Sequence, residues 1–133
     1  MDFLVDFYGM REPYEGELKF FRERPEVAGM ATEDNKIILN PFSTLSPREL
    51  SAVAQNEAIR LYLKQQDAAP NFDLTPEQLK MFKGTEYEKD SDAAKQSILA
   101  RILTNDPSAK NATLDQIMQA QMIRDQILSL KKR

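Results

Sequence analysis

A strong helix start at residues 46–49 constrains this fold more than any other stretch. Ser46 can cap a helix, Pro47 suits the first helical position, and Glu49 completes a capping box. The pattern predicts a helix over residues 47–66. At 100° per residue its apolar residues fall on two opposite sides: Leu50, Val53, Ala54 and Leu61 on one, Ala52, Ile59 and Leu63 on the other. A helix that is apolar on two sides lies between layers, so we expect it to be central.

Before this helix, the chain predicts one small β-hairpin over residues 27–40. Two short apolar segments flank Thr32-Glu33-Asp34-Asn35, a run of residues that favour turns. A two-stranded hairpin is marginal alone, so it needs helices to pack against. Residues 15–24 predict a short helix that Pro25 stops. Residues 1–14 mix aromatic and acidic side chains and predict an N-terminal arm, packed on the domain or on a partner.

After the central helix, the sequence predicts three further helices, over residues 76–83, 91–104 and 114–131. Capping boxes open the first and last of these, with the sequences Thr-Pro-Glu-Gln and Thr-Leu-Asp-Gln. Residues 85–90 are polar and predict a loop. The expected fold class is mainly α with one small hairpin (α+β), its central helix packed by shorter helices and a C-terminal helix. The 133 residues fit a single domain, 1–133.

The composition excludes several classes of function. The chain has no cysteine and no histidine, so disulfides, zinc hydrolase sites and histidine-dependent catalysis cannot be built. A formal charge of −3 disfavours a nucleic-acid partner, because phosphate binding needs a positive surface. The acidic start does not resemble a signal peptide, and no apolar run approaches a membrane span. We expect no cofactor, no metal, no membrane partner and synthesis in the cytoplasm.

The central helix carries one carboxylate in an unusual place, Glu57. It lies on an apolar side of the helix, and an unpaired buried charge there would be costly. We interpret Asn56, Glu57 and Arg60 as a structural polar anchor. In this interpretation Glu57 and Arg60 pair and lock the helix to the hairpin, and Asn56 and Asn40 add hydrogen bonds. If the pair is buried, Glu57→Ala should cost roughly 3 kcal/mol or more.

The alternative is that Glu57 has a chemical role. A strand followed by a helix bearing Asn56-Glu57-Ala58-Ile59-Arg60 resembles the H-E-x-x-H arrangement of zinc metalloproteases. In those enzymes two histidines bind zinc and the glutamate activates water. Asn56 and Arg60 stand at the histidine positions, so a working zinc hydrolase is excluded. A degenerate zincin-like protein, or a glycan-acting protein that uses Glu57, stays open as an alternative.

The predicted C-terminal helix is apolar around more than half of its circumference. Such a helix either passes through the core or contacts another chain with one of its sides. The candidate interaction surface combines four apolar residues of this helix with the basic terminus: Met118, Met122, Ile123, Ile127, Lys131, Lys132 and Arg133. The expected partners are other protein subunits, including further copies of this chain.

Two segments of the sequence carry a resemblance to a known family. The first has Gly29-Met30-Ala31 and then residues 35–43, N-K-I-I-L-N-P-F-S, and continues into residues 56–61; the second is residues 100–109, A-R-I-L-T-N-D-P-S-A. Both resemble small uncharacterised proteins encoded by tailed, podovirus-like phages. The resemblance transfers no catalytic residue.

This resemblance implies a phage origin and synthesis in the host cytoplasm. We expect a non-enzymatic structural or interaction protein of the virion, with the head–tail junction and the tail as candidate locations. The alternative is a phage-encoded soluble regulator that binds a host enzyme.

Overall fold

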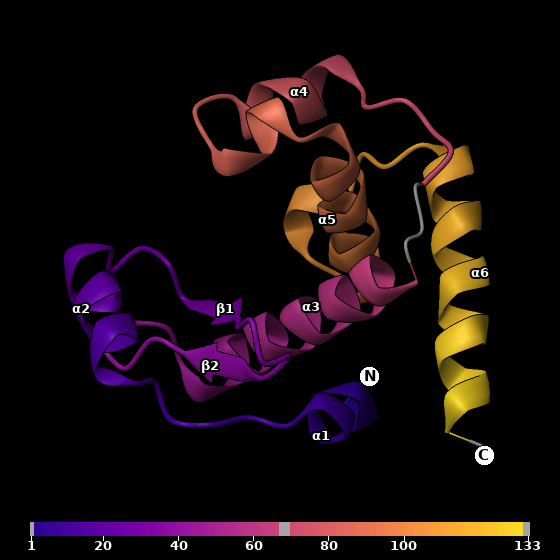
Figure 1. Cartoon of the computed structure of the whole chain (residues 1–133). Helices are drawn as coiled ribbons and strands as arrows, with labels where there is room; N and C mark the ends of the chain where they lie inside the picture. The colour runs from indigo at the N-terminus through magenta and orange to yellow at the C-terminus, as the bar shows by residue number, and fades with distance from the viewer. Residues whose placement is uncertain (1, 67–69, 132–133) are drawn as a thin grey trace. The chain divides into compact units, whose positions relative to one another are not determined.

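The computed structural model describes residues 2–66 and 70–131, which are mostly helical (Figure 1). Over these residues a mainly α fold with one small antiparallel hairpin is confirmed. Contacts within the chain divide it into two compact units, Met1–Tyr62 (unit 1) and Leu63–Arg133 (unit 2). The single domain expected over residues 1–133 stays a prediction.

Unit 1 contains two short helices, the hairpin and most of the central helix. These elements are α1 (Asp2–Tyr8), α2 (Glu15–Glu23), β1 (Gly29–Ala31), β2 (Ile37–Leu39) and α3 (Pro47–Gln65). The N-terminal segment is more regular than the expected arm. It forms a helix because Leu4 and Tyr8, four residues apart, share one face and are both buried.

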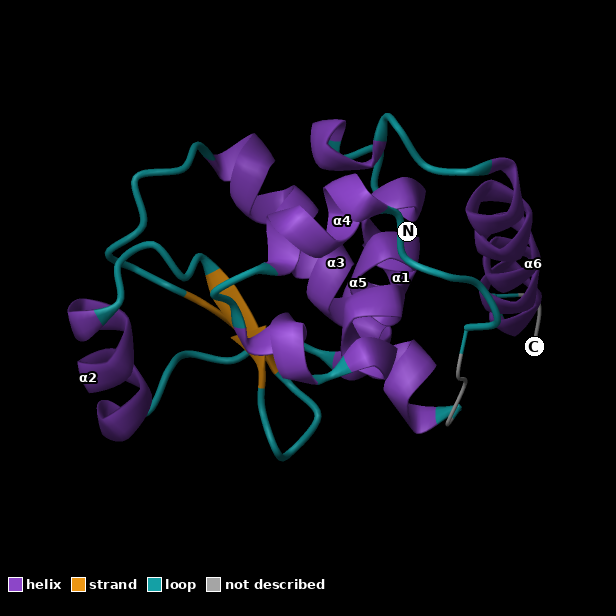
Figure 2. Ribbon diagram, turned by 90° about the horizontal axis from the view of Figure 1, so that it is seen from above, coloured by secondary structure: helices purple, strands orange, loops and turns teal. Residues whose placement is uncertain are grey.

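The hairpin has a tight turn and a third, short partner segment. Its strands pair Gly29 with Leu39 and Ala31 with Ile37, and Asn35 takes the left-handed conformation in the turn, with φ at 58°. Residues 9–11 run parallel beside β2. The Ile37 amide donates to the Gly9 carbonyl at 3.0 Å, and the Arg11 amide donates to the Ile37 carbonyl at 3.2 Å. The short strands (Figure 2) are therefore extended at one edge by the chain's own N-terminal segment.

The hairpin lies against α3 at a glycine (Figure 1). A Cβ atom on Gly29 would lie 2.9 Å from Val53 Cγ1 and 3.1 Å from the Ile38 carbonyl oxygen, closer than normal packing allows. Gly29 therefore permits the close approach of β1 to α3. The predicted capping box also forms, since the Glu49 amide donates to Ser46 Oγ and the Ser46 amide to Glu49 Oε1, both at 3.2 Å.

Burial along α3 follows the predicted two-sided pattern with one exception. Ile59 and Leu63 are fully buried on one side, and Leu61 and Ala54 are nearly so on the other. Ala52, which the sequence placed on an apolar side, is exposed. It lies in the first turns of the helix, before the fully buried stretch begins.

Unit 2 is built from helices and two 3₁₀ turns. Its elements are α4 (Pro76–Phe82), η1 (Glu86–Lys89), α5 (Ser91–Leu103), η2 (Pro107–Ala109) and α6 (Leu114–Leu130), and α5 packs against α6. The loop expected over residues 85–90 contains η1 instead. Thr85 caps this turn by accepting from the Tyr87 amide, and the Tyr87 ring packs on Phe82 at 5.1 Å between centroids.

A buried pair of glutamine amides joins the two predicted capping boxes of unit 2. Gln78 caps α4 with Thr75, and Gln116 caps α6 with Thr113, through the reciprocal bonds that define a capping box. The same two side chains donate to each other, Nε2 to Oε1, at 2.8 Å in both directions. Gln116 is fully buried and also donates to the Asp73 carbonyl at 3.2 Å. The pair therefore fixes the starts of two helices against one another.

Candidate interaction surfaces

The predicted ion pair of the polar anchor forms in the middle of α3. Arg60 Nη1 donates to Glu57 Oε1 at 2.9 Å, and Asn56 lies half-buried beside Glu57. The Glu57 side chain is 11% exposed and that of Arg60 is 25% exposed. The pair thus lies at the edge of the core, where it satisfies a poorly hydrated carboxylate within one helix. This arrangement supports a structural role for Glu57.

Asn40, expected as a further partner of Glu57, serves the hairpin instead. Its buried amide donates to the Val27 carbonyl at 2.7 Å, and its Oδ1 accepts from the Phe42 amide at 2.8 Å. Asn40 therefore fixes the chain on both sides of β2. Gly29 and Val53 form one close contact between hairpin and helix, and the proposed locking role of Glu57 and Arg60 stays a prediction.

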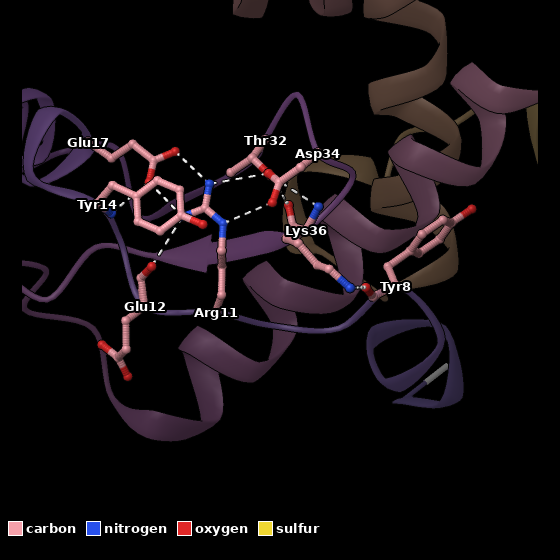
Figure 3. Close-up of polar contacts among 8 residues, drawn as sticks. All are labelled: Tyr8, Arg11, Glu12, Tyr14, Glu17, Thr32, Asp34 and Lys36. Atoms are coloured by element: carbon pink, nitrogen blue, oxygen red, sulfur yellow. Dashed lines mark hydrogen bonds and ion pairs between the residues drawn. The ribbon is translucent and has the colours of Figure 1, made fainter.

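A polar cluster in unit 1 surrounds Arg11 (Figure 3). Its guanidinium binds Glu17 through Nη1 and Nη2 at 2.7 and 2.9 Å, and Asp34 through Nε and Nη2 at 3.2 Å each. A further bond from Nη1 to the Glu12 carbonyl at 3.1 Å engages the last of its five N–H donors. The Tyr14 ring covers the guanidinium, 3.8 Å from Cζ to the ring centroid. The cluster ties the start of α2 to the hairpin turn.

The charges of this cluster shift one another's protonation. Hydrogen bonds from Arg11 hold the pKa of Asp34 down at about 2, and the Thr32 hydroxyl adds to the effect. The pKa of Glu17 is lowered mainly by its bonds from Arg11. Glu17 first and Asp34 second raise the pKa of Arg11. All three groups are therefore charged at neutral pH, and their mutual bonding accounts for the shifts without a ligand.

The sequence interpretation missed this cluster because its residues form no local sequence pattern. Arg11 lies six residues from Glu17 and 23 from Asp34, outside the spacing of helical ion pairs. Lys36 is a second such case. Its Nζ donates to the Tyr8 carbonyl at 2.9 Å, at the end of α1, where a positive charge is favoured.

The predicted interaction surface on α6 divides between two faces of the helix. Met118 and Met122 are 57% and 61% exposed, whereas Ile127 is fully buried and Ile123 is half-buried. Nine residues separate Met118 from Ile127, which puts them on opposite sides of the helix. Ile127 is therefore a core residue, and its assignment to the surface was wrong. Lys131 is exposed, and Lys132 and Arg133 lie outside the described residues.

The exposed side of α6 is apolar near its start and basic near its end. Leu114 and Ile117 extend the surface of Met118 and Met122. Further along, the exposed residues Arg124, Leu128 and Lys131 follow at i, i+4 and i+7 and so share one face. We call these three residues the basic face of α6.

An open groove in unit 1 combines apolar walls with two acidic residues. It has a volume of about 460 Å³ and lies between α1, β2 and the first turns of α3. Its lining is mostly apolar: Val5, Met10, Leu39, Pro47, Leu50 and Ala54, with Ser51. Asp2 and Asp6 lie one helical turn apart and complete it, and Gln55 donates to Asp2 at 2.8 Å. We call this the acidic groove.

Within the described residues, no group of three or more acidic side chains is placed to hold a metal ion. None of the described helices is both long enough and apolar enough to pass through a membrane. Comparisons of the chain with protein-family models, with curated proteins and with solved structures gave no match.

Proposed function

We propose that this protein is a non-enzymatic structural component of a phage virion that works by contacting other protein subunits. One observation carries the interaction part of the proposal: α6 has two apolar faces, and the second remains exposed. Leu114, Met118 and Met122 are each more than half exposed along one helix, beyond what its packing in unit 2 needs.

The chemistry of this exposed face suits a protein partner. Methionine side chains are flexible and polarisable, so they adapt to a partner surface more readily than branched residues do. Leu114, Ile117 and Met118 stand at i, i+3 and i+4, a spacing used in helix-in-groove recognition, and Met122 follows one turn later. The acidic groove of unit 1 is a second, separate surface of mixed apolar and charged character. Two different surfaces suit a protein that joins subunits.

The phage part of the proposal rests on the sequence. The segments at residues 29–43, 56–61 and 100–109 resemble proteins of tailed phages, and the absence of histidine and cysteine removes the commonest catalytic groups. Glu57, the residue on which an enzymatic alternative depended, is held by Arg60 in an ion pair. The head–tail junction and the tail are the locations we propose.

Mass spectrometry of purified phage particles tests the proposal. Particles of the phage that encodes this chain are washed at increasing salt, and the copy number per particle is measured against the major capsid protein. The expected result is a constant copy number that survives washing. Presence only in infected-cell lysate would refute the proposal, and recovery of a single host enzyme with the tagged protein would favour a regulator instead.

The exposed face of α6 is tested in the same particles. A phage carrying Met118→Ser and Met122→Ser should incorporate much less of the protein, while Leu79→Ser, at an exposed leucine of α4, serves as the control for loss of exposed apolar area. Circular dichroism of the purified variants separates weak incorporation from misfolding. Normal incorporation of the double variant would exclude this face as the contact surface.

A further inference from the structure

We propose that copies of this chain associate head to tail, the basic face of α6 in one copy binding the acidic groove of unit 1 in the next. This inference rests on the proposed function, because it names a second copy of the chain as one of the subunits contacted. It goes beyond that function in assigning both contact surfaces and the geometry of the contact.

The acidic groove offers apolar area that nothing in unit 1 covers. Its walls come from three separate elements, α1, β2 and α3, which pack around Leu39 and Leu50. Met10, at one edge, is half exposed, and Phe7, in the neighbouring turn of α1, is 69% exposed. Asp6 is also exposed, so the groove presents apolar contacts next to negative charge.

The basic face of α6 has the complementary composition. Leu128 is an apolar side chain between two cations, Arg124 and Lys131, and all three are exposed on one side of the helix. In the sequence, Lys132 and Arg133 add two more positive charges directly after them. An apolar residue flanked by cations fits an apolar groove flanked by carboxylates. The charge pairs attract the two surfaces and also fix the orientation in which α6 binds the groove.

The overall charge distribution points the same way. Residues 1–62 contain eleven acidic and seven basic side chains, whereas residues 63–133 contain ten acidic and eleven basic ones. The acidic excess of the chain therefore lies in the part that carries the groove. Such asymmetry favours encounters between unit 1 of one copy and the end of α6 of another, and it opposes contact between two grooves.

The geometry of such a contact has a consequence for assembly. In this head-to-tail arrangement the contact is heterologous, so a joined pair keeps one free groove, on one copy, and one free α6, on the other. Repeating it gives a closed ring or an open chain, whereas reciprocal pairing of the same surfaces between only two copies would stop at a two-fold dimer. Rings and chains of identical subunits are the forms that a structural component of a particle would use.

Sedimentation velocity of the purified full-length chain over a series of concentrations tests the inference. The expected result is association beyond a dimer that weakens as salt is raised, because the attraction between charges is screened. Asp6→Lys alone should weaken association by at least about tenfold, and Arg124→Glu with Lys131→Glu should do the same. The matched controls, Glu86→Lys and Lys83→Glu with Lys110→Glu, change the net charge equally at other exposed positions and should leave association unchanged.

Charge exchange makes the test specific. An equimolar mixture of the Asp6→Lys chain with the Arg124→Glu, Lys131→Glu chain should regain association, because each variant supplies the surface that the other lacks. A mixture that stays monomeric overturns the inference when circular dichroism shows native helix content in both variants. A parent chain that is monomeric at all concentrations also overturns it.

The two proposals fail separately in these experiments. If the chain is monomeric in solution but is found at constant copy number in washed particles, the head-to-tail contact is refuted and the virion function is supported. If the chain assembles in solution through Asp6 and Arg124 but is absent from particles, the virion function is refuted and the head-to-tail contact is supported.

Discussion

Each unit of this chain contains a polar network that links its own elements, and the two networks are of opposite kinds. In unit 1 the network is ionic: one guanidinium, Arg11, gathers Glu17 and Asp34 near the surface. In unit 2 it is neutral: Gln78 and Gln116 exchange amide hydrogen bonds inside the core. Both networks link the start of a helix to a distant segment, yet they should respond to different conditions.

The difference follows from hydration. The carboxylates around Arg11 keep part of their contact with water, so each ion pair contributes little to stability. The glutamine amides are buried, so water cannot replace a lost hydrogen bond. Removing either amide therefore leaves the other buried without its partner. Exposed networks adjust to solution conditions, and buried ones depend on an intact partner.

The largest effect is expected from the buried pair. Gln116→Ala should lower the free energy of unfolding by about 3 kcal/mol, because it strands the Gln78 amide and removes a helix cap. Urea denaturation measures the loss, and Gln119→Ala, which removes more exposed bonds to the Asn71 backbone, is the control. Equal losses for Gln116→Ala and Gln119→Ala would show that burial of the pair does not matter.

Hydrogen exchange of the same Gln116→Ala variant tests how the units are coupled. If they unfold separately, protection should fall at the amides of α4 and α6 and persist in the hairpin. An equal fall in both units would instead establish the single cooperative domain that the sequence predicts.

A smaller effect is expected where the hairpin meets α3. Gly29→Ala should cost about 2 kcal/mol, because the added methyl group overlaps Val53 and the Ile38 carbonyl. Gly16→Ala is the matched control: an added Cβ there has nothing within 4 Å, and alanine favours the helix α2 that contains it. Thermal unfolding should therefore shift in opposite directions, and a neutral Gly29→Ala would mean that β1 can move away from α3.

The ion pair of α3 should give an intermediate loss. Glu57→Ala is expected to cost about 1.5 kcal/mol, between the values typical of exposed and of buried pairs, since Arg60 keeps contact with water. This is below the value of roughly 3 kcal/mol predicted for a buried pair. In urea titrations Glu57→Gln, which keeps a hydrogen-bond acceptor, should recover part of the loss. A loss under about 0.5 kcal/mol would place Glu57 in solvent.

The smallest effect, and the only one tied to pH, is expected at Arg11. The folded pKa of Asp34 lies at about 2, below its ordinary value near 4. The stabilisation is therefore complete above about pH 4 and is lost as the pH falls through about 2. Arg11→Met should abolish this acid dependence in the exchange of amides 32–36, with Arg48→Met as the control. An unchanged acid dependence would remove Arg11 as its cause.

Local signals account for what the sequence predicted correctly. Ser46 with Glu49, Thr75 with Gln78 and Thr113 with Gln116 act within four residues, so each helix start was readable before the fold was known. The turn at Asn35 was readable for the same reason. The exceptions were α1, expected as an arm, and the 3₁₀ turns η1 and η2, whose short patterns are too weak to be separated from loops.

The candidate surfaces were harder to predict because a helix pattern does not say which side is covered. Residues 114–131 are apolar over so wide an arc that periodicity leaves the packed face open. In the folded chain Ile127 is fully buried, while Met118 is 57% exposed. The acidic groove was missed altogether, since Asp2 and Asp6 meet Leu39 and Leu50 only through folding.

The sequence by itself determined the hairpin, the helices α2 to α6, the lack of histidine and cysteine chemistry and the capping boxes of α3, α4 and α6, because these depend on single residues or near neighbours. Only the tertiary structure decided that Gln78 meets Gln116, that Arg11 gathers Asp34, and that Gly29 admits Val53. Those partners are 38, 23 and 24 residues apart, and a separation of that length is closed by packing of the whole unit, not by any local preference.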